Sequence, residues 1–354
     1  MPDLLCLGEP MLELNRQPPD AQGRALYLEG FGGDTSNTAI AAARQGAEVG
    51  YISALGEDPA GRGLRALWEA EGVDHATVLS DPAAPTGLYL VTHDDTGHHF
   101  AFFRAGSAAS RLGPDRLPRA AIARARILHL SGISQAISTA ACDAGFHAIA
   151  LARAAGVLVS YDTNLRLRLW PAPRAAAVIH AAVAQADIAL PSLEDAVALT
   201  GLATPDAVAD FYLRLCPLVL VKCGAAGVLV ATRSGRIALP GHAVAAVDAT
   251  GAGDAFAGAF LARASAGDDA VTAARYANAA AALATTGYGA VAPIPREPAV
   301  RALLAQAPGG AGGADAPSGA GAPGGAGTPG WASALARARH AAPAEPPALA
   351  EPRA

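Results

Sequence analysis

The chain has 354 residues, 52% of them apolar, and a net charge of −5. This balance is typical of a soluble globular protein and argues against a nucleic-acid partner, because no basic patch stands out. The start, MPDLLCLGEPMLELN, carries acids and no basic segment before a long apolar run, so we expect a cytoplasmic protein with no membrane partner.

The four cysteines are scattered and show no CxxC or Cys/His metal spacing. Such a pattern fits a reducing compartment and buried thiols, and we propose no metal cage from it. The cysteines are Cys6, Cys142, Cys216 and Cys223.

The first third of the chain predicts a small β-sheet. ALYLEGFGG (25–33) is strand-like, and TGLYLVTHDDTGHHFAFFRAG (86–106) predicts two strands joined by a hairpin turn at 94–97. We expect residues of about 11–33 and 86–104 to form a β-lid over the ligand edge of a larger sheet.

Small and short polar residues follow the first of these strands. Gly32 and Gly33 would let a ligand approach the backbone closely, and Asp34 and Asn37 suit hydroxyl recognition. Alternatively, Asp34 or Asn37 caps the helix TAIAAARQG.

The middle of the chain alternates short apolar runs with helical stretches. This alternation predicts a parallel sheet covered on both faces, with ligands at the carboxyl ends of the strands. The strand-like runs are ILHLSG (127–132), VLVSYDTN (157–164), ADIALPS (186–192) and LVLVKCG (218–224), and helical examples are 138–156 and 173–186.

The stretch DATGAGDAF (248–256) opens a helix with small residues. Exposed backbone N–H groups at Gly251, Ala252 and Gly253 would form an anion site. Asp254 would repel a bound phosphate, but it makes sense as a general base that takes a proton from an attacking hydroxyl. The alternative is a plain helix-capping Asp.

From Ala307 onward Gly, Ala and Pro dominate, and large apolar groups are few. We therefore expect a folded domain over residues 1–305 and a disordered tail over 306–354.

Two long stretches resemble a known family. DATGAGDAF resembles the C-terminal signature of the ribokinase-like (PfkB) carbohydrate kinases, and GGDTSNTAIAAARQGAEVGYISALGEDPAGRGLRALWEAEGVD (32–74) resembles their N-terminal signature. The similarity runs from Leu5 to about Pro293. It implies a three-layer α/β/α, Rossmann-like ribokinase fold with a β-sheet lid, the cofactors ATP and Mg²⁺, and phosphoryl transfer to a sugar hydroxyl.

The resemblance also implies roles for single residues. It makes Asp254 the catalytic base and the preceding Gly-Ala-Gly an anion hole. VLVKCGAAGVLV matches a nucleotide-binding turn at Lys222, Gly224 and Gly227, although Lys222 could be an ordinary charge at a strand end. Asn278 falls at an adenine-side position, or is a polar residue on a solvent-facing helix turn.

One motif departs from the family. Ser192 and Asp195 replace the Asn and Glu that help to organise Mg²⁺, so Asp195 would act through water, with Glu194 adjacent. The similarity further implies a monovalent cation, K⁺, near Asp248 and Thr250.

The arginines decide between a neutral sugar and a sugar acid, because a guanidinium matches a carboxylate in bidentate fashion. We choose Arg104 and Arg166, although a loop arginine is usually a solvated surface residue. TGLYLVTHDDTGHHFAFFRAGSAAS and ILHLSGISQAIS resemble the 2-keto-3-deoxygluconate kinases of the family. That resemblance implies sugar contacts by Tyr89, Phe102 and the backbone near Ile133, although an aromatic hydroxyl common before the lid arginine is absent.

The sequence therefore predicts an ATP-dependent kinase acting on the 6-hydroxyl of 2-keto-3-deoxy-D-gluconate, with a homo-oligomer formed through the β-lid. DTNLRLRLW also resembles the fructokinase pattern, so a neutral-sugar kinase is the nearer alternative. A catalytically silent sugar- or nucleotide-binding regulator is the alternative of another class.

Overall fold

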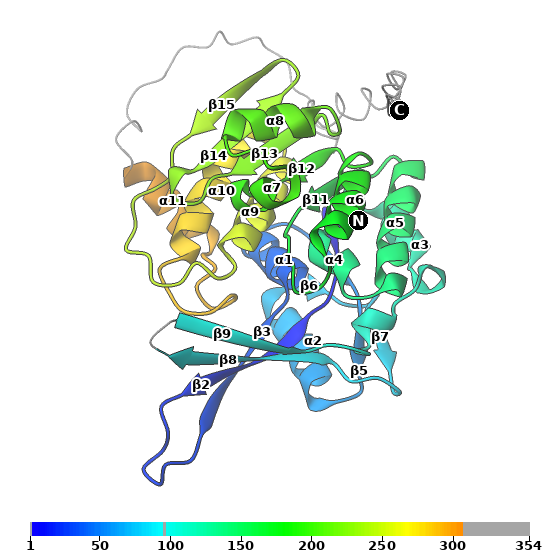
Figure 1. The fold of residues 1–354 in the computed structure, drawn as a ribbon, viewed down its shortest axis with the longest axis vertical. Helices are drawn as coiled ribbons and strands as arrows, with labels where there is room; N and C mark the ends of the chain where they lie inside the picture. The colour runs from blue at the N-terminus through cyan, green and yellow to red at the C-terminus, as the bar shows by residue number, and fades with distance from the viewer. Residues whose placement is uncertain (1, 95–96, 307–354) are drawn as a thin grey trace, which may run out of the picture.

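The computed structural model describes residues 2–94 and 97–306, and a large mixed sheet crosses the middle of this part of the chain (Figure 1). Its order is β15-β14-β13-β12-β11-β10-β1-β4-β6. The strands are β1 (Leu4–Leu7), β4 (Val49–Ile52), β6 (Val73–Asp74), β10 (Ile127–Ser131), β11 (Leu158–Asp162), β12 (Ile188–Leu190), β13 (Leu218–Lys222), β14 (Val228–Thr232) and β15 (Gly235–Leu239).

The strands from β6 to β13 pair in parallel, and β14 and β15 continue the sheet in antiparallel fashion. The parallel strands are short apolar runs buried on both faces, as such sheets require. Their carboxyl ends therefore meet along one edge of the sheet, where ligands of α/β proteins bind.

Helices cover both faces, and each face has its own apolar core. This confirms the predicted three-layer fold. One face carries α1 (Asp34–Arg44), α2 (Pro59–Glu71), α9 (Ala252–Ala266), α10 (Ala270–Ala284) and α11 (Glu297–Gln306); the other carries α3 (Arg119–Arg124), α4 (Gly132–Ala136), α5 (Thr139–Ala154), α6 (Ala172–Val183), α7 (Leu193–Thr200) and α8 (Pro205–Leu213).

Helices α1 and α9 cross closely. Gly258 of α9 lies so near α1 that a Cβ on it would be 2.4 Å from the carbonyl oxygen of Thr38 and 2.6 Å from Cβ of Ala41. Most of α9 is buried, with Phe256, Phe260 and Leu261 at 3% exposure or less. The contact therefore fixes the start of α9 against the start of α1.

A separate four-stranded sheet, the lid, lies below the large sheet in the view of Figure 1. Its order is β3-β2-β8-β9; β2 and β8 are parallel and the other pairs antiparallel. Met11, Tyr89 and Val91 form a small apolar cluster within it. The lid strands are β2 (Met11–Gln17), β3 (Leu26–Gly32), β8 (Gly87–Asp94) and β9 (Gly97–Phe103), and β5 (Ala54–Gly56) and β7 (Leu79–Asp81) form a further pair.

The predicted Gly/Ala/Pro-rich tail lies outside the described residues, apart from Gln306 at the end of α11. Within the described part of the chain, the helices are all too short or too polar to cross a lipid bilayer.

Candidate active site

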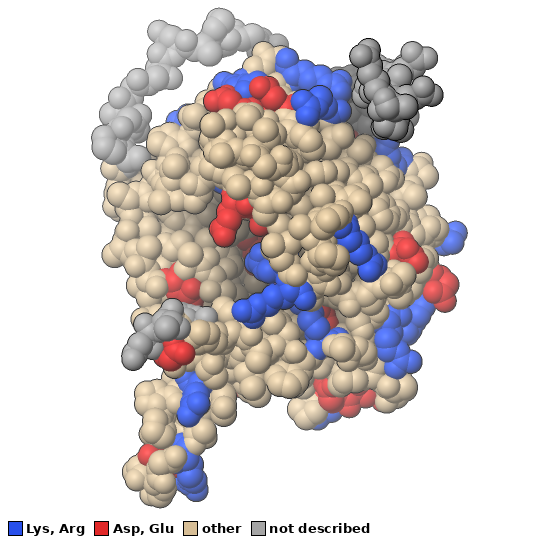
Figure 2. Space-filling view, in the orientation of Figure 1, with Lys and Arg blue, Asp and Glu red and all other residues tan. Residues whose placement is uncertain are grey.

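A cleft of about 1050 Å³ opens between the lid and the carboxyl ends of the large sheet's strands. Figure 2 shows this face hollowed, with basic and acidic side chains gathered at the opening. The lining comes from the end of β1, the lid, the ends of β11 and β13, and the first turns of α1 and α9. Segments from the whole length of the domain thus meet at one place.

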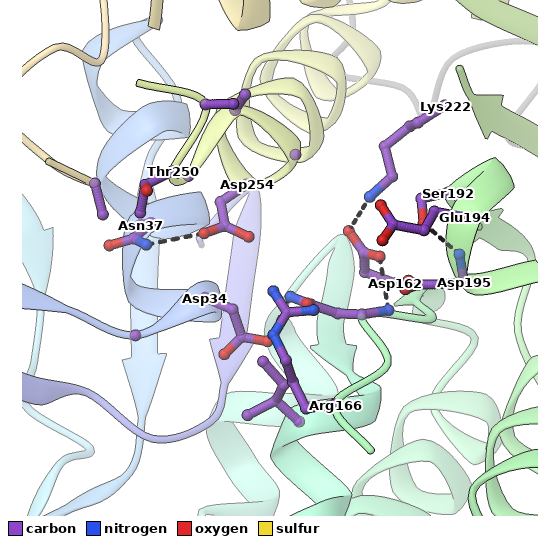
Figure 3. Close-up of a pocket in the computed structure, with 18 of the residues that line it drawn as sticks. Asp34, Asn37, Asp162, Arg166, Ser192, Glu194, Asp195, Lys222, Thr250 and Asp254 are labelled. Carbon is purple, nitrogen blue, oxygen red and sulfur yellow. Dashed lines mark hydrogen bonds and ion pairs between the residues drawn. The ribbon is translucent and has the colours of Figure 1, made fainter. Parts of the chain in front are cut away.

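Asp254 lies in the first turn of α9 and faces the cleft (Figure 3). The helix begins after Gly251, which has a φ of 76° and makes no side-chain cap, and Gly251, Ala252 and Gly253 also line the cleft. The carboxylate of Asp254 accepts a hydrogen bond from Asn37 Nδ2 at 2.8 Å, across the α1–α9 contact. Asn37 is therefore neither a cap nor a surface residue.

The surroundings of Asp254 favour its protonated form. Burial raises the pKa of Asp254 to about 8, and the nearby charge of Asp34 adds to the effect, whereas the hydrogen bond from Asn37 and the charge of Lys222 oppose it. A carboxylate with a pKa near neutrality is suited to general base catalysis.

Asp34 and Asn37 present unpaired oxygens beside this base. Among the described residues, Asp34 Oδ1 and Asn37 Oδ1 are buried and have no hydrogen-bond partner. The other oxygen of Asp34 accepts from the Ser131 hydroxyl and, at 3.2 Å, from Asn164 Nδ2. Because an unpaired buried acceptor costs free energy, this arrangement fits a ligand that brings hydroxyl donors.

Gly33 is required for the chain to enter α1. Its φ is 120°, and a Cβ on it would lie 2.4 Å from the carbonyl oxygen of Glu9. Gly33 is also the N-cap residue of α1, so the helix begins without a hydrogen bond from a capping side chain. The alternative of a side-chain cap by Asp34 is thus not what the structure has.

The predicted lid residues all line the cleft, but one has an unexpected partner. Tyr89 donates its hydroxyl to Glu13, and Phe102 stacks on Phe100. Arg104 forms an ion pair with Glu9, which is fully buried, and its Nε–Oε2 distance is 2.6 Å. Burial raises the pKa of Glu9, and the charge of Arg104 offsets only part of that shift. Ile133, from α4, completes this wall.

Arg166 and Arg168 line the cleft from the segment after β11. Both are exposed; Arg166 donates to the carbonyl of Leu165 at 2.8 Å and Arg168 to that of Phe100 at 3.1 Å. Within the described residues, neither forms an ion pair with a carboxylate.

The nucleotide-turn residues are partly in the cleft. Lys222 and Gly224 line it, whereas Gly227 is not among the lining residues. A Cβ on Gly227 would lie 2.1 Å from the carbonyl oxygen of Leu239. Asn278 is buried in α10 and donates to the carbonyl of Pro240 at 2.6 Å, so it is not on a solvent-facing turn. It lies outside the residues that line the cleft.

The predicted cation residues are already used in the fold. Asp195 Oδ2 accepts from the Thr163 hydroxyl at 3.0 Å and the Leu165 N–H at 3.1 Å, and Ser192 caps α7. Asp248 accepts from the N–H groups of Thr250 and Gly289, which joins two loops beside the start of α9.

Four charged or amide side chains of the cleft were not singled out from the sequence. Glu9 follows β1, and Asp162, Asn164 and Arg168 follow or end β11. The rule that ligands gather at the carboxyl ends of parallel strands would have pointed to all of them.

The chain is similar to known carbohydrate kinases. The family model described as pfkB family carbohydrate kinase matches residues 1–297. Fructokinase-1 of Zea mays is 37% identical over 292 residues, covering 79% of this chain and 90% of its own. The 2-dehydro-3-deoxygluconokinase of Thermoproteus tenax is 35% identical over 311 residues, covering 84% and 93%. A double mutant of the Vibrio cholerae O395 fructokinase, crystallised with fructose, ADP and potassium ion, has a TM-score of 0.75 and 32% identity, covering 85% and 98%.

Proposed function

The chain belongs to the pfkB family of carbohydrate kinases, and from that premise we propose that it transfers the γ-phosphoryl group of ATP to the 6-hydroxyl of 2-keto-3-deoxy-D-gluconate. The observation that carries the choice of a sugar acid is the pair Arg166 and Arg168 at the cleft, with no carboxylate paired to either among the described residues. A neutral sugar needs no such cations, whereas a substrate carboxylate would.

In this reaction Asp34 and Asn37 bind sugar hydroxyls with their unpaired oxygens. Asp254 accepts the proton of the attacking hydroxyl, since it is the carboxylate next to the N–H groups of Gly251–Gly253. Those N–H groups, at the positive end of α9, stabilise the charge on the transferred group. The lid excludes water, which would otherwise compete as acceptor.

The acidic lining of the cleft fits Mg²⁺ bound with ATP. Asp162, Glu194 and Asp195 all line it, but among the described residues no three His, Cys, Asp or Glu side chains gather to hold a metal by themselves. Mg²⁺ usually keeps several waters and takes one or two carboxylates plus the substrate's phosphates. When bound, Mg²⁺ would neutralise phosphate charge. Asp195 would hold its waters through Oδ1, since its bonds from Thr163 and Leu165 use Oδ2.

We extend the proposal to potassium. The loops joined by Asp248 lie beside the start of α9, and the V. cholerae fructokinase relative was crystallised with potassium ion. Asp248 and Thr250 belong to the loop that a monovalent cation would stiffen. Lys222 and Gly224, which line the cleft, stay assigned to the nucleotide. Asn278, which lies outside the cleft lining and holds the carbonyl of Pro240, stays assigned to the adenine side.

The lid is also the proposed site of self-association. Its outer strands β3 and β9 carry the exposed apolar side chains Leu26, Tyr27, Leu28 and Phe103. An uncovered strand edge with apolar side chains favours pairing with a second copy.

Fructokinase activity is the second candidate, and a specific observation favours it. Arg104 forms an ion pair with Glu9. One of the two arginines predicted to bind a substrate carboxylate therefore already has its charge matched inside the protein. The maize fructokinase and the T. tenax 2-dehydro-3-deoxygluconokinase are also about equally similar to this chain.

The test is ADP release with Mg-ATP from 2-keto-3-deoxygluconate, gluconate, fructose and ribose, with Asp254→Asn as the control. A kcat/KM preference for the keto acid supports the proposal, and a preference for fructose transfers it to the second candidate. Absence of ADP release with every sugar would indicate a silent binding protein. Asp254→Asn should lower kcat by about 100-fold to 10,000-fold and leave ATP binding intact.

A further inference from the structure

Lys222 is the single lysine among the 26 lysine and arginine residues of the chain. Every other basic position, including the three others that line the cleft, holds arginine. The two side chains are not equivalent, because arginine carries a wide planar fork and lysine a compact point charge on a flexible stem. The one lysine of the chain thus lies in the cleft.

The fold holds this ammonium group firmly. Lys222 is the last residue of β13, and its backbone N–H donates to the carbonyl of Pro191 at 2.8 Å. Its Nζ donates to Oδ2 of Asp162 at 2.5 Å, as Figure 3 shows. The two side chains are 15% and 4% exposed, and the other oxygen of Asp162 accepts the N–H of Asn164 at 3.2 Å. Asp162 thus keeps Lys222 inside the cleft.

The ammonium group lies against the first turn of α9. A Cβ on Gly253 would be 3.5 Å from Nζ of Lys222, which is an ordinary van der Waals distance, so the ammonium group is a direct neighbour of this turn. An ammonium group beside the N-terminal end of a helix adds its charge to that of the exposed N–H groups. The ammonium group of Lys222 has three N–H donors, and among the described residues Asp162 accepts one of them. The other donors can bind a ligand.

We propose that Lys222, positioned by Asp162, is a catalytic residue that contacts the phosphoryl group during its transfer. The proposal rests on the proposed kinase function. The bond from the sugar oxygen to the γ-phosphorus forms, the bond from that phosphorus to the bridging oxygen breaks, and its electron pair stays on ADP. The hydroxyl proton passes to Asp254, and Lys222 keeps its proton and neutralises charge on the moving group.

Two simpler roles make different predictions. If Lys222 only bound the nucleotide, its loss would raise the KM for ATP. If the Asp162–Lys222 pair only joined β11 to β13 across β12, its loss would lower stability and affect all kinetic constants through misfolding. A catalytic contact lowers kcat and leaves the KM for ATP nearly unchanged.

The experiment measures the kinetics and thermal unfolding of Lys222→Ala, Lys222→Arg and Asp162→Asn, with and without added ethylamine. We expect Lys222→Ala to lower kcat about 100-fold or more with the KM for ATP changed less than threefold, and ethylamine to restore kcat at least tenfold. Lys222→Arg should remain impaired, and Asp254→Asn, the matched control, should gain nothing from ethylamine. Asp162→Asn should lower kcat less than Lys222→Ala.

The wild-type protein offers a second test that needs no variant. An amine-directed reagent, trinitrobenzenesulfonate, can react with one lysine side chain and the N-terminal amine, and mass spectrometry separates the two. Activity should fall in proportion to labelling of Lys222, and ATP should slow that labelling. Full labelling with activity retained, or a Lys222→Ala variant with wild-type kcat or no response to ethylamine, would overturn the proposal. No ADP release from the wild type with any sugar would overturn the proposed function as well.

Discussion

Nε of Arg104, at the end of the lid, donates to Oε2 of Glu9 at 2.6 Å, and Glu9 is fully buried after β1. The charge of Arg104 is therefore matched within the protein before any substrate binds. Arg166 and Arg168 differ, because their hydrogen bonds go to backbone carbonyls, which carry no net charge. A substrate carboxylate would thus be stabilised more by Arg166 and Arg168 than by Arg104.

The first prediction concerns Arg166. Because a hydrogen bond to a charged group contributes roughly 1.5–3 kcal/mol, Arg166→Ala should raise the KM for 2-keto-3-deoxygluconate about 10-fold to 100-fold. The KM for ATP should change little in steady-state assays. Arg236→Ala, which removes a surface pair with Asp206 and Asp210, is the matched control and should leave both constants unchanged. Equal increases for the acid and for ATP in Arg166→Ala would refute the carboxylate contact.

The second prediction concerns the Glu9–Arg104 pair. Arg104→Met should lower the free energy of unfolding by about 3–5 kcal/mol at pH 8, because it leaves Glu9 buried without its cation. Burial raises the pKa of Glu9, so in the variant the folded state binds the proton more tightly than the unfolded state. The free energy of unfolding that the variant loses relative to the wild type should therefore grow as pH rises above the ordinary pKa of a glutamate, and it should be smaller at pH 5. Urea unfolding at both pH values measures this.

The companion variant Glu9→Gln/Arg104→Met removes both charges. It should recover part of the stability lost by Arg104→Met, since no buried charge is left unpaired. A deficit that is the same at pH 5 and pH 8 would mean that lost packing, and not the charge of Glu9, causes the destabilisation.

The third prediction concerns pH. Asp254 must be deprotonated to act as a base, and its pKa is raised to about 8 by burial and by Asp34. Below that pH, kcat/KM should fall about tenfold per pH unit, because this constant reports the free enzyme. Asn37→Ala should move the inflection to higher pH, since the hydrogen bond from Asn37 lowers the pKa of Asp254. A flat profile between pH 6 and pH 8 would contradict the base assignment.

The fourth prediction concerns the contact of α1 with α9. Gly258→Ala places a Cβ against the backbone of Thr38 and should lower the free energy of unfolding by about 1–3 kcal/mol. It should also lower kcat, because Asn37 and Asp254 lie on the two helices that are pushed apart. Gly113→Ala is the control: Gly113 has a φ of −97°, and there the Cβ meets only the carboxylate of the exposed Asp115. Chemical denaturation and turnover are measured for both variants. An unchanged kcat in Gly258→Ala would show that the packing of α1 against α9 does not control turnover.

Local chemistry made much of the fold predictable. The buried strands β10 to β13 are apolar runs that end in polar or small residues, and the glycines before Asp254 mark the start of α9, so the sheet and its ligand edge follow from the sequence. The lid strands β8 and β9 were marked by the hairpin signal at 94–97, and β3 by the strand-like run 25–33.

Partners across the fold were not predictable. Nothing local to AFFRAGS reveals that Arg104 meets a glutamate 95 positions earlier, and nothing local to LVLVKCG reveals that Lys222 meets Asp162. The Asp162–Lys222 pair arises because the parallel strands β11 and β13 end at the same edge of the sheet. The Glu9–Arg104 pair arises because the end of lid strand β9 lies beside the segment after β1. Sequence spacing expresses neither relationship. The same holds for Asn278, whose partner Pro240 lies in a loop without regular structure.

The hydrogen bond between Asn37 and Asp254 spans 217 positions of the chain. On the ribosome, α1 is complete long before α9 has been synthesised. Until then its inner face is exposed to solvent, although Ile40 and Ala41 on this helix are almost fully buried in the finished protein. A nascent chain that ends before Asp254 thus lacks both the base and the helix that shields α1. Catalytic competence arrives with the last elements to emerge, so premature termination yields chains that expose apolar surface and have no activity.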